Sequence, residues 1–235
     1  MRDPSIHRAY WEGARDSLPF LIVVIPFGMI FGVLASEAGW TLAQILGMSV
    51  LVVAGASQFT ALQLLGEHAP LIICIVAPLA INLRMAMYSA SLAPHIGGAP
   101  RWQRALAAYA LTDQTYGIVM NRYALRPGMS RAQKMAHYFG TAIPVCVPWY
   151  LSTWAGAVAG TAIPKGLALD FAVPITFIAL FAPALRSVPH IAAAVVAAAV
   201  ALALSFLPYN LWLLVAAGAG MLTGSVLEAW QERRR

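Results

Sequence analysis

Long stretches without a charged side chain constrain this sequence more than any other feature. The first runs from Leu18 to Ala35, and comparable apolar runs recur to the carboxyl terminus. A helix needs about 20 apolar residues to cross a bilayer, where helices and closed barrels are the structures that satisfy the backbone. Only 10% of the 235 residues are charged, against about 25% in soluble domains. The sequence therefore predicts an all-α, polytopic membrane protein.

We expect about eight transmembrane segments, some broken or kinked, in a single membrane-embedded domain. Residues 1–17 form an interfacial segment on the cytoplasmic side, residues 18–227 the bundle, and residues 228–235 a cytoplasmic tail. The expected segments are Leu18–Ala35, Leu42–Leu65, Pro70–Leu92, Ala105–Tyr123, Met135–Gly160, Leu167–Leu185 and the two halves of Ile191–Leu227, divided at Leu207-Pro-Tyr-Asn210.

Positive charges set the expected orientation, because Lys and Arg concentrate on the cytoplasmic side of membrane proteins. With both termini in the cytoplasm, eight segments place most of the 15 basic residues there. Arg101 and Arg104 fall outside and do not fit. A re-entrant second segment, leaving seven true spans, would remove this misfit. The basic residues form no single patch, so we expect a lipid bilayer around the chain and no nucleic-acid partner.

A weak internal similarity at an offset of 125 residues indicates a possible internal repeat. Halves with an even number of spans would be parallel repeats, whereas an odd number per half would invert them. The matching positions are Pro19 with Pro144, Val33 with Val158, Leu42-Ala43 with Leu167-Ala168, and Ala54 with Ala179.

Polar residues lie far from the ends of three apolar runs. Such residues are costly in lipid and by default mark a functional site. Glycine allows a helix break, and broken helices bind solutes in transport proteins. The candidate binding residues are Gly55, Ser57 and Gln58 in the second run, Asn82 and Arg84 in the third, and Thr112 and Asp113 in the fourth.

Each candidate also has a structural interpretation. Arg84 and Asp113 could form an ion pair between helices, or bind a ligand, with Asp113 as a proton carrier. A carboxylate at the midplane costs about 2.5 to 3.5 kcal/mol, so Asp113 needs a partner or a proton. Gln58 and Asn82 could hydrogen-bond neighbouring helices. A hydroxyl such as that of Ser57 commonly bonds to its own helix.

An intramembrane hydrolase is not expected. Ser57 would need a histidine at the same depth, but the five histidines fall in loops or at the ends of runs. Cys74 and Cys146 lie inside apolar runs and follow no metal-ligand spacing, so they are expected to be small buried side chains. We expect no catalytic residue, no metal and no cofactor. Aromatic residues near the ends of runs, including Trp149, fit an interfacial belt.

Several of these segments resemble the AzlC family, the large subunits of bacterial branched-chain amino acid exporters. The similarity extends from about residue 13 to residue 227, and its carboxyl-terminal half matches mainly in hydropathy. The segments that carry it are Gly13-Ala-Arg-Asp-Ser-Leu-Pro19, Ile25-Pro-Phe-Gly28, Gly55-Ala-Ser-Gln-Phe59, Asn82-Leu-Arg84, Ser91-Leu-Ala-Pro94 and Leu111-Thr-Asp113.

The resemblance implies a secondary transporter in the bacterial inner membrane that exports leucine, isoleucine, valine and methionine. It also implies a small hydrophobic AzlD-like subunit as partner, and we allow for a homo-oligomer of that heteromer. Arg84 and the backbone near Gly55 would bind the substrate carboxylate, with Asp113, Gln58 and Asn82 receiving its ammonium group. A passive channel, or a structural subunit for another small solute, is the alternative.

Overall fold

A computed structural model of the chain describes residues 4–160, 187–207 and 211–232, and the regular structure in these ranges is helical. This confirms the all-α prediction; the expected segment at 167–185 lies outside the described residues. The helices are α1 (Pro4–Ser17), a 3-10 turn (Leu18–Phe20), α2 (Leu21–Glu37), α3 (Leu42–Leu51), α4 (Gly55–Gly66), α5 (Leu71–Asn82), α6 (Arg84–Ile96), α7 (Arg101–Tyr109), α8 (Asp113–Leu125), α9 (Arg131–Gly160), α11 (Val188–Ala203) and α12 (Leu211–Glu232).

Three of the described helical stretches are long and apolar enough to cross a membrane. They cover Ser5–Glu37, Leu71–Ile96 and Arg131–Gly160. In the first stretch, the apolar part begins at Leu18, so the amphipathic α1 precedes the spanning segment and fits the interfacial helix expected at residues 1–17. The chain divides into two compact units, residues 1–62 with 78–167 and residues 63–77 with 168–235.

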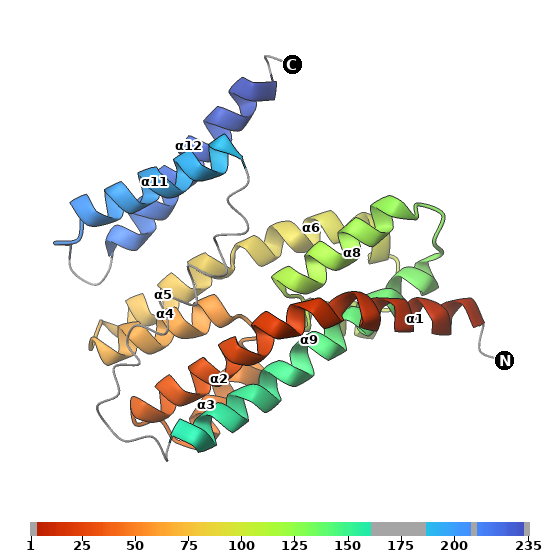
Figure 1. Ribbon diagram of the computed structural model, residues 1–235, viewed down its shortest axis with the longest axis horizontal. Helices are drawn as coiled ribbons and strands as arrows, with labels where there is room; N and C mark the ends of the chain where they lie inside the picture. The colour runs from red at the N-terminus through yellow and green to blue at the C-terminus, as the bar shows by residue number, and fades with distance from the viewer. Residues whose placement is uncertain (1–3, 161–186, 208–210, 233–235) are drawn as a thin grey trace. The chain divides into compact units, whose positions relative to one another are not determined.

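In the first unit, α1 and α2 lie along α9 (Figure 1). Glycine makes this close approach possible: a Cβ atom on Gly32 would collide with the carbonyl oxygen of Thr153, and one on Gly156 with the carbonyl oxygen of Met29. Small residues at a helix interface let two backbones pack in contact, which is a common way for membrane helices to associate.

The stretch formed by α1 and α2 runs in the same direction as α9. Gly13 lies against Thr141, near the start of α9, whereas Gly160, at its end, lies against Val33. Residues that contact each other across this interface are therefore separated in the sequence by close to 125 residues, the offset of the internal similarity. This parallel arrangement is the one expected of parallel repeats. Residues 167, 168 and 179, which carry other matches, lie outside the described residues.

The second apolar run is a broken helix, as the glycine at its centre allows. Residues 52–54 separate α3 from α4, and Gln58 Nε2 lies 3.3 Å from the carbonyl oxygen of Met48. In one continuous helix, ten residues would place these positions about 15 Å apart. The chain therefore turns at the break, which brings the Gln58 side chain to the last turn of α3.

The fourth apolar run corrects an expectation, because it does not cross as one helix. Residues 110–112 interrupt it, and both of its ends meet the start of α9. Near its start, Ala107 accepts a hydrogen bond from Tyr138 (2.6 Å), and at its end Tyr123 donates one to the carbonyl of Lys134 (2.7 Å). Arg131 also donates a hydrogen bond to the carbonyl of Gly98 (3.0 Å), in the loop before the run. A straight helix over residues 101–125 would be about 37 Å long. The α7–α8 segment is therefore a hairpin that enters and leaves on one side.

This hairpin also corrects the expected position of Arg101 and Arg104. Both residues lie in α7, directly after the loop that contacts Arg131. They share one end of the first unit with the basic residues at the α8–α9 connection. We call this the basic end of the unit.

In the second unit, α11 and α12 pack as an antiparallel pair. His190, near the start of α11, lies 3.3 Å from Glu228, near the end of α12. One turn further along α11, Ala193 and Ala197 face Gly224 and Gly220 of α12. These small residues allow close contact of the kind seen between α2 and α9.

Candidate functional site

All seven candidate residues lie beside an interruption in an apolar helix. We call three such interruptions breaks: residues 52–54 and 110–112 lie outside helices, whereas residue 83 is a single turn residue whose backbone angles stay helical, so that Leu71–Ile96 remains one long stretch. Around these breaks lie Gly55, Ser57 and Gln58 in the first turn of α4, Asn82 and Arg84 at the α5–α6 junction, and Thr112 and Asp113 at the start of α8. Interrupted helices offer backbone and side-chain groups to a ligand at membrane depth.

Arg84 and Asp113 join two of the breaks. Arg84 Nη2 lies 2.9 Å from Asp113 Oδ2, and the two side chains are 31% and 38% exposed. The pair is thus neither sealed in the core nor fully solvated. Arg84 Nε and Asp113 Oδ1 are buried and have no hydrogen-bond partner within the described residues. The ion pair leaves capacity for a further polar group.

Local structure explains why Asp113 stands at this position. Thr112 is the N-cap of α8, and its hydroxyl accepts a hydrogen bond from the backbone N–H of Thr115 (3.2 Å). Asp113 follows in the first turn, where a negative charge is stabilised by the helix dipole. Thr112 therefore has the structural role of a cap, and Asp113 carries the charge.

Gln58 is fully buried and holds the first break together. Its Nε2 atom donates to the carbonyl of Val52 (2.7 Å) and lies within 3.3 Å of Met48 O and Ser49 Oγ. Ser57 donates to the carbonyl of Pro78 (3.0 Å), which ties α4 to α5. Both side chains satisfy backbone carbonyl groups. Gln58 bonds to the neighbouring helix α3, one of the two roles that the sequence left open, whereas Ser57 bonds to α5 and not to its own helix as expected.

Unsatisfied polar atoms gather around the breaks. A buried donor or acceptor without a partner costs about 1 to 3 kcal/mol, and each such group calls for an explanation. In the described residues, the buried side-chain atoms without a partner include Gln58 Oε1, Asn82 Oδ1, Arg84 Nε and Asp113 Oδ1. A polar ligand at the breaks would satisfy atoms of this kind.

Trp149 was missed by the sequence analysis and corrects the interfacial-belt interpretation. It lies within α9, is 8% exposed, and has a buried Nε1 atom without a partner in the described part of the chain. Its ring atom Cη2 would be 2.9 Å from a Cβ on Gly55. The glycine at the first break thus provides the space that the indole ring occupies.

Tyrosines add two further contacts near the breaks. Tyr88 and Tyr116 stack with ring centroids 4.2 Å apart, one turn beyond Arg84 and Asp113 on α6 and α8. Tyr109, at the end of α7, donates to the carbonyl of Val50 (2.8 Å) at the end of α3. No local signal in the sequence distinguishes these tyrosines from those of an aromatic belt.

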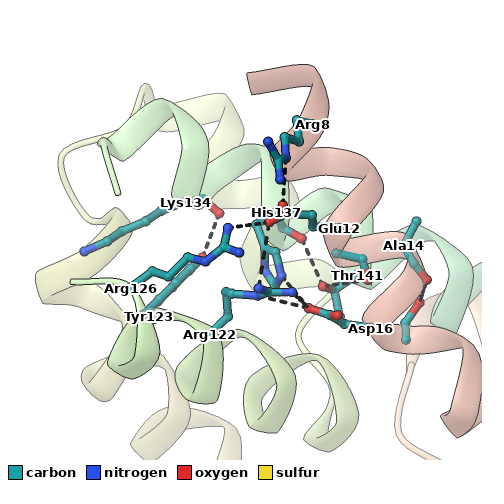
Figure 2. A network of polar contacts seen from close by, with 12 residues as sticks. Arg8, Glu12, Ala14, Asp16, Arg122, Tyr123, Arg126, Lys134, His137 and Thr141 are labelled. Carbon is teal, nitrogen blue, oxygen red and sulfur yellow. Dashed lines mark hydrogen bonds and ion pairs between the residues drawn. The ribbon is translucent and has the colours of Figure 1, made fainter. Parts of the chain in front are cut away.

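A second charged cluster lies at the basic end, where α1 meets α8 and α9 (Figure 2). Arg122 Nη2 lies 2.6 Å from Asp16 Oδ2, and His137 Nε2 lies 3.1 Å from the same oxygen. Arg126 Nη1 lies 2.9 Å from Glu12 Oε2. We call these five residues the α1 network. Because α8 carries Asp113 at its other end, one helix links the two charged clusters.

His137 lies near the start of α9, as expected for a residue at the end of a run, but it does not face solvent. The side chain is fully buried, and its Nδ1 atom has no partner among the described residues. On α1, outside the spanning segment, burial raises the pKa of the Asp16 carboxyl, but hydrogen bonds and charges from Arg122 and His137 outweigh burial and hold that pKa below its usual value.

Metal chemistry has no visible support in the described ranges, where no three His, Cys, Asp or Glu residues lie close enough to hold an ion. The available groups at the breaks are a guanidinium, a carboxylate, two side-chain amides and an indole. Of these groups, the guanidinium of Arg84 and the carboxylate of Asp113 are in contact and present both charges at one place.

A family model described as AzlC protein matches residues 19–163. An uncharacterized membrane protein of Archaeoglobus fulgidus is 29% identical over 230 residues, which cover 93% of this chain and 94% of that protein. The inner membrane protein YgaZ of Escherichia coli K12 is 27% identical over 232 residues, which cover 94% of this chain and 92% of that protein. An uncharacterized membrane protein of Helicobacter pylori J99 is 27% identical over 177 residues, covering 73% and 75%. No solved structure matches the chain.

Proposed function

The chain belongs to the AzlC family, and from that premise we propose that it exports branched-chain amino acids as the large subunit of a secondary carrier. Its relatives are membrane proteins, which supports a transport-related role in a membrane. The proposed substrates are leucine, isoleucine, valine and methionine, and the proposed location is the bacterial inner membrane.

One observation supports this proposal above all others. Arg84 and Asp113 form a partly exposed ion pair where two interrupted helices meet within apolar runs. A zwitterionic amino acid needs a cation for its carboxylate and acceptors for its ammonium group. Arg84 would bind the carboxylate and Asp113 the ammonium, exchanging their mutual contact for contacts with the substrate.

Buried acceptor atoms beside the helix breaks support the same assignment. Asn82 Oδ1 and Gln58 Oε1 are acceptors without a partner in the described chain, and an ammonium group has three donors. Gly55 lies at the amino terminus of α4, where the helix dipole favours an anion such as a carboxylate. Thr112 contributes through the cap of α8.

We further propose that Asp113 carries the proton that couples export to the proton gradient. A carboxylate near the centre of a membrane protein needs a cation or a proton, and substrate binding would remove its contact with Arg84. An Asp113→Asn variant should therefore lose the dependence of export on the proton gradient. Retention of the full dependence would contradict this role.

The proposed orientation places the basic end, the amino terminus and the carboxyl terminus in the cytoplasm. The hairpin topology supports it, because Arg101 and Arg104 now lie on the same side as Arg126 and Arg131. The proposed partner is a small AzlD-like membrane subunit, and the heteromer could assemble further into a homo-oligomer. Copurification of the two subunits, followed by mass measurement in detergent, tests both steps.

Counterflow of labelled leucine in proteoliposomes tests the function directly. Vesicles containing this chain and its small partner should exchange leucine in a saturable way, and Arg84→Ala should abolish exchange. Arg101→Ala is the matched control, since Arg101 also begins a helix but is exposed at the basic end. A folded protein that exchanges neither leucine, valine nor methionine would refute the substrate assignment.

The partial exposure of the ion pair also favours one second candidate, a passive channel. A polar constriction accessible from outside the protein serves a pore as well as a carrier. Counterflow distinguishes the two, because a channel cannot use a gradient of unlabelled leucine to accumulate labelled leucine. Uptake that stays linear with concentration and shows no accumulation would favour the channel.

A further inference from the structure

An apolar cavity of about 190 Å³ lies between α6, α7 and α9 of the first unit. Its walls include Leu92 and Ile96 of α6, Ala107 of α7, Leu111 beside the third break, and Tyr138 of α9. These five residues are all buried and belong to one hydrophobic cluster. One side of the cavity is therefore formed by the core of this unit, whereas its other side is open and is lined by the exposed residues Ser89, Ala93, Arg104 and Ala108.

The wall formed by α7 and α9 is fixed in position. The Tyr138 side chain is fully buried, and its hydroxyl donates a hydrogen bond to the carbonyl of Ala107 (2.6 Å). Across the cavity, Leu92 is 3% exposed. Because the methyl group of Ala107 is the smallest side chain among the buried wall residues, this position determines how much space remains.

The elements that line the cavity also carry the Arg84–Asp113 pair. Leu111 stands two residues before Asp113, a separation of at most about 7 Å along the backbone. Ser89, at the cavity edge, follows Arg84 by five residues on α6. One polar pair and one apolar cavity therefore share α6 and the break between α7 and α8.

We propose that this cavity receives the aliphatic side chain of the transported amino acid while Arg84 and Asp113 bind its charged groups. The inference rests on the proposed function and adds the part of the site that selects the side chain. An engineered apolar cavity of about 150 Å³ binds benzene, and the side chain of leucine or isoleucine, with four carbon atoms, is smaller. The cavity thus suits branched aliphatic side chains.

Two opposite changes in cavity volume test the proposal. Ala107→Leu fills the cavity, whereas Leu92→Ala enlarges it. One methylene in an apolar pocket changes discrimination by about 10- to 200-fold. Ala107→Leu should therefore weaken competition by leucine and isoleucine at least about 10-fold more than competition by alanine. Leu92→Ala should shift preference towards larger side chains such as that of phenylalanine.

Ala105→Leu is the matched control, because Ala105 lies on the same helix and is exposed. Competition against labelled leucine counterflow is measured for alanine, valine, leucine, isoleucine and phenylalanine, with each variant checked for folding by gel filtration. If Ala107→Leu does not fold, the test rests on Leu92→Ala alone: its order of preference among the five competing amino acids should shift towards phenylalanine.

The outcomes separate this inference from the proposed function. Wild-type exchange combined with an unchanged rank order in the folded variants would overturn the inference and leave the carrier in place. An equal loss for all five amino acids would overturn it too, since a structural or lipid-binding cavity predicts that result. Absence of any wild-type exchange would overturn both proposals.

Discussion

Arg122 Nη2 lies 2.6 Å from Asp16 Oδ2, so the carboxyl-terminal part of α8 is tied to the end of α1. The two side chains are 18% and 31% exposed, and His137 shares the same carboxylate oxygen (Figure 2). Removing either side chain would leave the other as a charge that has lost its partner and is largely shielded from water. The α1 network therefore holds the amphipathic helix against the hairpin that carries Asp113.

The first prediction concerns this contact. We expect Arg122→Ala to lower the free energy of unfolding by about 1.5 to 3 kcal/mol, because hydrogen bonds to charged groups are worth that much and the Asp16 carboxylate loses its cation. Thermal or denaturant unfolding of the purified protein measures the change. Arg8→Ala is the control, since the Arg8 side chain is 79% exposed and pairs with Glu12 within α1. Equal effects of the two variants would contradict the prediction.

A second prediction concerns the packing of α2 on α9. Gly32→Val should prevent stable folding, because even a Cβ atom would collide with the Thr153 backbone and both helices are fixed along their length. Yield of monodisperse protein after detergent extraction reports the outcome. Gly117→Ala in α8 serves as control. In the described residues, no atom beyond its own stretch of helix lies within 4 Å of the added Cβ, and alanine stabilises a helix by about 0.5 to 1 kcal/mol relative to glycine. A well-folded Gly32→Val protein would show that the helices can separate.

The third prediction concerns the first helix break. Gln58→Met keeps a similar volume but removes the donor that binds the carbonyl of Val52 and approaches Met48. We expect destabilisation of about 1 to 3 kcal/mol, since a buried carbonyl loses its partner. Gln63→Met, on the same helix, is the control because Gln63 bonds only to Glu67 at the surface. Hydrogen exchange at residues 52–58 should increase in Gln58→Met alone.

Hydropathy predicted the helical membrane architecture because uncharged runs of this length leave few other structures. Among the polar residues within those runs, the sequence linked only the stretch around Gly55 and Gln58 to a break, whereas the interruptions beside Asn82 and Asp113 became visible in the structure. In each case the side chain is near a point where backbone groups lose their helical partners, so polarity and interruption occur together.

The direction of the chain after each break was not predictable in the same way. A broken run has the same hydropathy whether the second helix continues across the membrane or turns back. For α7–α8 the only signal was the misplaced charge of Arg101 and Arg104. Trp149 illustrates a different limit, because its contact with Gly55 joins positions 94 residues apart and depends on tertiary packing alone.

The last prediction follows from the lowered pKa of Asp16, which lies on α1 outside the spanning segment. Its carboxyl has a lower pKa in the folded protein than in the unfolded chain, so folding favours the ionised form. The resulting stabilisation is present above the unfolded pKa of about 3.9 and is lost as the pH falls through the folded value. The wild type should therefore unfold at a higher temperature than Asp16→Asn at pH 7, and the difference should narrow as the pH falls from about 5 to about 3. A difference that is constant over this range would mean that Asp16 stabilises the fold without its charge.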